Sequence, residues 1–275
     1  MTQESGNQES GNQGAGRQIP DSPIPNPLHL LFWFSLLLVL AIAGLGLGLS
    51  MQRTQSAYPG LSPTVPLAAD KSYGVNADLT FCSPDALDRS LTRMSDLGLR
   101  WIRQPFPWAK IEPARGQFDW ERWDRVVEAA GRHGLHLIAV LDTAPTWAHP
   151  PEVNPFTPPT ELADFGTFAR TLAVRYGNRL DYYQIWDEPN LSAHWGDRFV
   201  DPAAYARLLR EGAVNIRAAD AEALILTAAL APTVETGPLN LNEPDFLAGL
   251  YAAHAAPWFD VVAAQPYGFD AAPTA

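Results

Sequence analysis

Apolar residues divide the chain into an uncharged block, two polar stretches around it, and a long region of shorter patterns. Residues 28–49 run for 22 residues without a charge, and a helix of that length spans about 33 Å, close to the hydrocarbon thickness of a bilayer. Residues 1–27 are polar and rich in Gly, Gln and Ser, and residues 50–72 carry Ser, Gln and Pro. We therefore predict a disordered tail over 1–27, a transmembrane anchor over 28–49, a linker over 50–72 and a folded domain over 73–275.

A cleaved signal peptide is the alternative interpretation of the apolar block. Signal peptides have a shorter apolar region behind a basic leader, whereas the leader here is long and slightly acidic. We therefore prefer an uncleaved single-pass anchor, and secretion after cleavage stays the alternative.

From residue 73 onward, short runs of strand-forming residues alternate with segments of helical periodicity. Ser83, Asp119 and Asp201 are candidate N-caps that open three of the helical segments, and glycines close several of them. The predicted strands are 73–79, 99–106, 135–142, 180–186, 223–230 and 259–267.

Successive βα units predict a parallel sheet, because parallel neighbours need a crossover and the helix supplies it. An open doubly wound sheet and a (β/α)₈ barrel both fit this order. The turn after the first strand, GVNADLTFCSPD, has neither G-x-G-x-x-G nor a Walker motif. Polar and aromatic residues instead follow most of the strands, which is typical of the barrel. We predict a (β/α)₈ TIM barrel with about six of its eight units present.

The net charge limits which partners the chain can bind, and the cysteine content limits its disulfides. The chain has 30 Asp and Glu against 19 Lys and Arg, a net charge of −11, which argues against binding to nucleic acid. With one cysteine, Cys82, no internal disulfide can form. Neither a metal-ligand spacing nor a nucleotide-binding motif occurs, so we predict no metal and no cofactor. The pattern predicts no oligomeric state.

The stretch DYYQIWDEPNL, residues 181–191, places Asp187 and Glu188 directly after the fourth predicted strand. Pro189 has no backbone donor, so strand pairing stops there. Carboxylates at the mouth of a buried strand cost solvation energy unless they are used. They serve either catalysis or ion pairs with nearby arginines, and the sequence around them decides between the two.

This stretch and the upstream block LGLRWIRQPFPWAKIEPARGQFDWERWDRVVEAAGRHGLHLIAVLDTAPTWA together resemble the clan A glycoside hydrolases, especially families 5 and 39. The resemblance covers about residues 73–267. IWDEPN is similar to the W-N-E-P-N motif that carries the general acid/base at the end of the fourth strand. The resemblance therefore implies Glu188 as acid/base, with Asp187 and Asn190 beside it in the substrate site.

Four further residues are predicted to bind substrate. Arg103 matches the family arginine that ends the second strand and orients the nucleophile, and Tyr267 matches the sixth-strand tyrosine near it. Gln265 stands where family 5 has a histidine. Trp147, in the loop DTAPTWAHPP, is the predicted sugar platform, because a flat aromatic face suits a sugar ring.

The resemblance implies a retaining mechanism with two carboxyl groups about 5–5.5 Å apart. Asp187 replaces the family's asparagine, and an ionised Asp can only accept hydrogen bonds. The family's nucleophile is a Glu after the seventh strand, and we predict only six strands. We interpret the other carboxylates as loop charges, caps or rim contacts, with Asp142 as a remote substitute: Asp142, Glu235, Glu243 and Asp270.

These patterns together predict a membrane-tethered retaining glycosidase that acts on oligo- or polysaccharides. Its resemblance to polymer-degrading enzymes places the catalytic domain outside the cell. Because the strand-7 nucleophile is not among the predicted strands, we expect the 275-residue chain to be inactive by itself. The alternative is a non-catalytic, surface-displayed carbohydrate-binding relative of the same fold.

Overall fold

The structure is a computed structural model that describes residues 73–150, 153–265 and 267. The predicted tail, anchor and linker, residues 1–72, and the carboxylate of Asp270 lie outside these residues. Within the described ranges no helix is long and apolar enough to cross a bilayer.

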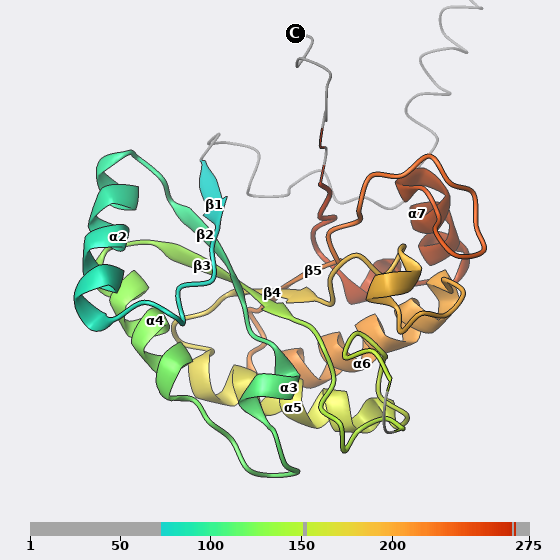
Figure 1. Cartoon of the computed structure of the whole chain (residues 1–275), viewed down its shortest axis with the longest axis horizontal. Helices are drawn as coiled ribbons and strands as arrows, with labels where there is room; N and C mark the ends of the chain where they lie inside the picture. The colour runs from blue at the N-terminus through green and yellow to red at the C-terminus, as the bar shows by residue number, and fades with distance from the viewer. Residues whose placement is uncertain (1–72, 151–152, 266, 268–275) are drawn as a thin grey trace, which may run out of the picture. The chain divides into compact units, whose positions relative to one another are not determined.

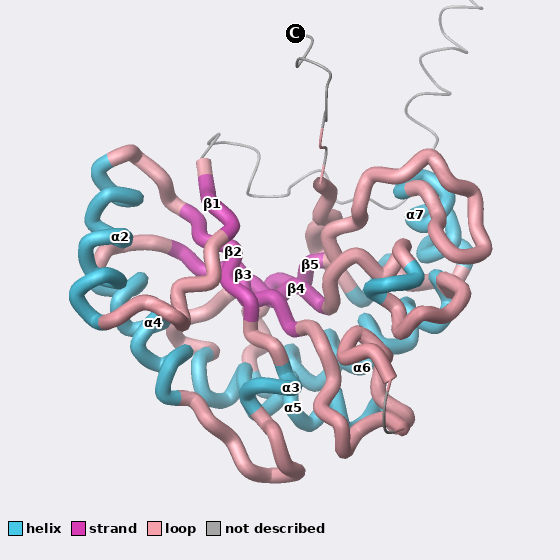
Figure 2. Tube along the Cα trace, in the orientation of Figure 1, coloured by secondary structure: helices cyan, strands magenta, loops and turns pink. Residues whose placement is uncertain are grey.

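Five parallel strands form one sheet whose spatial order follows the chain order (Figures 1 and 2). Every neighbouring pair is parallel; for example, Arg103 in the second strand lies beside Ile138 in the third. Consecutive parallel neighbours are the arrangement of a βα barrel wall. The strands are β1 (Gly74–Asn76), β2 (Trp101–Pro105), β3 (His136–Leu141), β4 (Tyr182–Ile185) and β5 (Leu224–Leu226).

Helices α2, α4, α5 and α6 follow one another along one side of this sheet (Figure 1). Their apolar faces are buried in a core of aliphatic and aromatic side chains, as the helical periodicity of the sequence predicts. The helices are α2 (Pro84–Asp96), α3 (Trp108–Ile111), α4 (Glu121–Arg132), α5 (Leu162–Tyr176), α6 (Pro202–Ala219) and α7 (Glu243–Ala252), with short 3₁₀ turns at Ser192–His194 and Ala256–Trp258.

Two of the three predicted N-caps are confirmed. The Ser83 side chain accepts a hydrogen bond from the Ala86 amide, and Asp201 accepts from the first amides of α6. Asp119 lies one residue before the N-cap position, which Trp120 holds, although its Oδ1 accepts from the Glu121 amide at the start of α4 (3.3 Å). The Asp119 amide donates to Ile111 O (2.8 Å), so this residue belongs to the loop that returns from α3.

The predicted sixth strand, residues 259–267, is wrong as a strand. Two isolated parallel bridges replace it, Leu226 with Val261 and Leu230 with Ala264. Between them the Ala263 amide donates to the Thr227 hydroxyl (3.0 Å) rather than to a backbone carbonyl. That side-chain bond interrupts the regular ladder, so the segment runs beside β5 without forming a continuous strand.

Candidate active site

The chain turns sharply as it leaves β4. Trp186 and Glu188 have φ angles of 70° and 49°, in the left-handed region that side chains other than glycine rarely adopt. The Trp186 amide donates to Leu141 O on β3 (2.8 Å), and the Glu188 amide donates to Ala229 O beyond β5 (3.1 Å). Because these two amides bond to opposite neighbours of β4, the side chains along the turn point in different directions. Strained backbone of this kind is common at functional sites.

Two buried aromatic side chains hold this turn in place. The Tyr205 hydroxyl on α6 donates to Ile185 O (2.8 Å) and accepts from the Ala228 amide (2.6 Å). The Trp186 indole donates to His194 O (2.9 Å). Burial raises the pKa of Tyr205, so its hydroxyl stays protonated and available as a donor. The end of β4 is therefore fixed from both sides.

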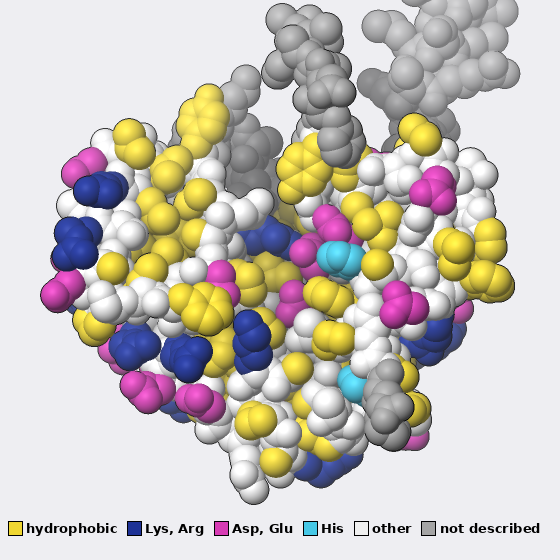
Figure 3. Space-filling model, viewed as in Figure 1, with side chains coloured by type: hydrophobic (Ala, Val, Ile, Leu, Met, Phe, Trp, Pro, Cys, Tyr) yellow, Lys and Arg dark blue, Asp and Glu magenta, His cyan; other side chains and the backbone are white. Residues whose placement is uncertain are grey.

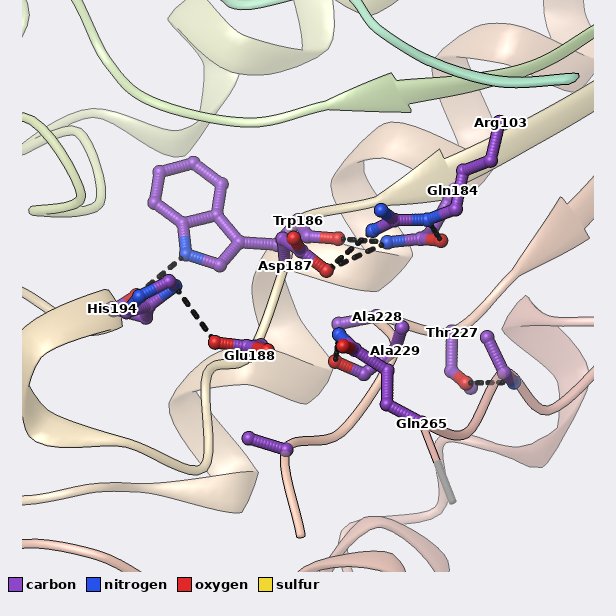
Figure 4. Close-up of polar contacts among 12 residues, drawn as sticks. Arg103, Gln184, Trp186, Asp187, Glu188, His194, Thr227, Ala228, Ala229 and Gln265 are labelled. Carbon is purple, nitrogen blue, oxygen red and sulfur yellow. Dashed lines mark hydrogen bonds and ion pairs between the residues drawn. The ribbon is translucent and has the colours of Figure 1, made fainter. Parts of the chain in front are cut away.

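Asp187 is engaged by an arginine, as Figure 4 shows. The Arg103 guanidinium on β2 donates to Asp187 Oδ1 (2.5 Å) and to Gln184 Oε1 (2.8 Å), and Gln184 Nε2 also donates to Asp187 (3.2 Å). Burial raises the pKa of Asp187, the Arg103 charge lowers it, and neighbouring Glu188 raises it again. The ion-pair interpretation of the two carboxylates therefore holds for Asp187.

Glu188 has a different partner. Its Oε2 lies 3.4 Å from Nδ1 of His194, and the two side chains are 19% and 30% exposed (Figure 4). No arginine or lysine of the described residues forms an ion pair with Glu188. The two adjacent carboxylates therefore differ in their partners. Asp187 is bound by the permanent positive charge of Arg103, whereas Glu188 faces the imidazole of His194 beside solvent.

His194 is a residue to which the sequence analysis gave no role in catalysis or substrate binding. Its ring stacks on Phe156 at 4.6 Å with a 20° interplanar angle, and its Nδ1 is buried without a hydrogen-bond partner among the described residues. The short turn Ser192–His194 returns the chain toward Glu188, and NLSAHW alone gave no periodic signal for this.

The other predicted substrate residues are distributed around this centre. Gln265 Nε2 lies 3.4 Å from Ala229 O, the carbonyl that also accepts from the Glu188 amide. Asn190 is fully buried, and its amide bonds only backbone groups of Ala231 and Leu241. We therefore interpret Asn190 as a residue that positions loops rather than a sugar ligand.

Trp147 and Tyr267 are the two remaining predicted substrate residues. The Trp147 indole donates to Glu112 O (3.0 Å), and the Arg115 guanidinium lies over its ring at 4.3 Å. A sugar stacking on that face would have to displace Arg115. Tyr267 is 54% exposed, and its role beside the nucleophile stays a prediction.

Asp142, at the end of β3, adds a third carboxyl group to this edge of the sheet. Its Oδ1 is shielded from solvent and has no hydrogen-bond partner among the described residues. Burial raises its pKa to about 7, the charge of Asp187 adds to this, and Arg103 and Lys110 oppose it. The positive charge of Arg103 therefore acts on both Asp142 and Asp187, and Asp142 is harder to ionise than an ordinary aspartate.

On the face shown in Figure 3, acidic side chains and a histidine meet near the middle. Of the two adjacent carboxylates after β4, Glu188 is partly buried and is not neutralised by an arginine. A carboxyl group in such an environment can give up and take back a proton next to a bound molecule.

Part of the chain is similar to known proteins. Residues 82–181 match the glycoside hydrolase family 42 model, described as beta-galactosidase. A 63-residue segment is 38% identical to Beta-galactosidase Bga of Halorubrum lacusprofundi, covering 22% of this chain and 9% of that enzyme. The matched family segment ends before Glu188, so the acid/base assignment depends on the IWDEPN motif and the geometry.

Solved structures share the fold. The GH39 enzyme from Xanthomonas axonopodis pv. citri has a TM-score of 0.50 and 20% identity, over 76% of this chain and 47% of that one. The beta-galactosidase from the psychrophilic Marinomonas ef1 has a TM-score of 0.53 and 13% identity, over 71% and 40%. The chain spans less than half the length of each of these relatives.

Proposed function

We propose that this chain, a clan A glycoside hydrolase by its matched sequence and its fold, cleaves O-glycosidic bonds of oligo- or polysaccharides with retention of configuration. One observation carries the proposal. At the end of β4 the structure holds two adjacent carboxylates, of which Asp187 is bound by Arg103 and Glu188 is not. The unneutralised carboxyl group has the position of the acid/base in the related motif.

In this mechanism Glu188 first protonates the glycosidic oxygen of the leaving group and later takes a proton from the attacking water. A second carboxylate attacks the anomeric carbon and forms the covalent intermediate. Arg103 keeps Asp187 in place beside the acid/base, and the imidazole of His194 limits where the Glu188 carboxyl group can point.

We also propose that β1 to β5 are consecutive strands of a (β/α)₈ barrel, with residues 261–264 continuing its wall. Support comes from the chain-ordered parallel sheet and from the glycosidase neighbours. In related enzymes the nucleophile follows the seventh strand, a position that is not among the described residues. Assays should therefore compare two proteins, the gene product as the genome encodes it and the 275-residue chain. We expect no turnover by the 275-residue chain.

The function is tested with aryl glycosides, starting with a β-galactoside because the sequence relatives are beta-galactosidases. We expect hydrolysis, with the first product appearing in the configuration of the substrate when followed by NMR. Inverted product would contradict the retaining mechanism. Saccharide binding without any hydrolysis by the complete gene product would favour the non-catalytic carbohydrate-binding alternative.

We further propose that residues 28–49 anchor the protein in the cell membrane with the catalytic domain outside, supported by the uncharged 22-residue run. Full-length protein is expected to stay with membranes after carbonate extraction and to be cut by protease added to intact cells. Recovery in the carbonate supernatant would overturn the anchor, and a shortened soluble form in the medium would identify signal cleavage.

A further inference from the structure

A second depression lies between the loop that precedes α5 and the loop that follows β4. It has a volume of about 400 Å³, within the range of small-ligand sites. Pro158, Pro159, Trp195 and Phe199 are among the residues that line it. No residue placed in the candidate active site above lines it.

The two loops that form this depression are tied together. The Asn154 amide donates to Ala193 O (2.8 Å) and to Asp197 Oδ2 (3.1 Å). Gly196, with φ +78°, packs so closely that a Cβ atom there would lie 2.5 Å from the Thr157 hydroxyl. The loops are therefore held in contact, and the depression has fixed walls.

Two arginines line the depression, Arg198 from the loop and Arg207 from the second turn of α6. Neither forms an ion pair with a carboxylate among the described residues. The one polar bond of Arg198 uses its Nε, which donates to Trp195 O at 3.4 Å. On a chain with a net charge of −11, two unpaired guanidinium groups in one depression favour an anionic ligand.

One carboxylate also lines the depression. Asp201 Oδ1 accepts from the amides of Ala203 and Ala204, so it serves as the cap of α6. Two guanidinium groups and one carboxylate give a formal charge of +1. This net positive charge attracts an anion, and the two guanidinium groups are the donors that would bind it.

The apolar part of the wall indicates what carries the anion. Phe199 is 66% exposed, whereas Trp195 is 3% exposed. An exposed aromatic ring and two proline rings in one depression offer apolar faces, which suit the carbon face of a sugar ring. We propose that this depression binds a uronic acid residue of a saccharide, with Arg198 and Arg207 holding its carboxylate. The sugar class rests on the proposed function; the anion site rests on the two arginines.

The depression shares a loop with the candidate active site. Trp195 packs edge-on against Trp186 at 6.1 Å between ring centroids, and Trp186 immediately precedes Asp187. The same loop carries His194, which faces Glu188. A saccharide held in the depression is therefore bound by the loop that also forms the catalytic turn.

The test is calorimetric titration of the full chain with tetragalacturonate, with a neutral galacto-oligosaccharide of the same length, and with inorganic phosphate. We expect tetragalacturonate to bind and the neutral sugar to bind at least about tenfold more weakly, with the difference shrinking at high salt. Arg198→Gln and Arg207→Gln should each weaken uronate binding about tenfold. Both side chains are exposed, so neither variant should impair folding.

Arg170→Gln is the matched control, because it removes one exposed arginine from the neighbouring helix α5. Lost uronate binding with aryl-glycoside hydrolysis retained would show failure of the subsite alone, and retained uronate binding without hydrolysis would show failure of the proposed catalysis alone. Equal affinity for the acidic and neutral sugars, or unchanged affinity in both arginine variants, would overturn the proposal. Phosphate binding as strong as that of the uronate would show a simple anion site and overturn the sugar assignment.

Discussion

Replacing Glu188 by Gln in the complete gene product is expected to slow hydrolysis of alkyl glycosides and natural oligosaccharides by about 10²–10⁴-fold. Gln keeps the size of the side chain but cannot donate a proton to the leaving oxygen. Aryl glycosides with acidic leaving groups need little protonation, so the first step on those substrates should be slowed far less. The measurement is kcat/KM on both substrate classes.

Glu235→Gln is the control for this change. Glu235 is an exposed loop carboxylate whose Oε1 accepts from Asn240 (2.8 Å), so its variant should keep kcat/KM on both substrates. Small and equal losses for Glu188→Gln on both substrate classes would show that another group supplies the proton. A uniform loss with reduced thermal stability would instead report damage to the turn after β4.

Asp142 is expected to make the folded domain less stable as the pH rises. Burial raises its pKa from 3.8 to about 7, so between these values the folded state holds a proton that the unfolded state has released. The free energy of unfolding then falls with rising pH by about 1.4 kcal/mol per pH unit. From pH 4 to pH 8 the contribution of Asp142 amounts to as much as about 4 kcal/mol.

Urea unfolding of the full chain between pH 4 and pH 8 measures this dependence. Asp142→Asn cannot ionise, so it should remove most of the decline and be more stable than the wild type at pH 8. Asp96→Asn, at the exposed end of α2, is the control and should keep the wild-type slope. The raised pKa of Asp187 acts in the same direction and leaves a smaller residual slope in Asp142→Asn. An unchanged slope in that variant would show that Asp142 is ionised in the folded protein.

Patterns of local origin were predictable from the sequence. Helix caps depend on one side chain and the next three amides, so Ser83 and Asp201 are correctly identified. Five strands are found where apolar β-forming runs occur, although each is shorter than predicted. The IWDEPN motif places the carboxylates at the end of β4 because strand, motif and Pro189 are contiguous.

Contacts between distant segments needed the tertiary structure. The sequence predicts a strand over residues 259–267, because nothing local reveals that the Thr227 hydroxyl accepts a hydrogen bond from the Ala263 amide. It left open whether Asp187 and Glu188 form ion pairs with nearby arginines, and only the fold brings Arg103, 84 residues earlier, to Asp187. Hydrogen bonds and charge pairs between separate βα units depend on register and crossover geometry, which no short window of sequence contains.

The sequence by itself thus determined the βα alternation, the helix starts and the position of Glu188 at a strand end. The tertiary structure decided which carboxylate is free of an arginine, brought His194 to Glu188, and buried Asp142 beside Asp187. The physical reason is the separation along the chain between the residues that interact. Periodicity and caps are set by neighbours within a few residues, whereas solvation and charge at the site are set by side chains that only folding brings together.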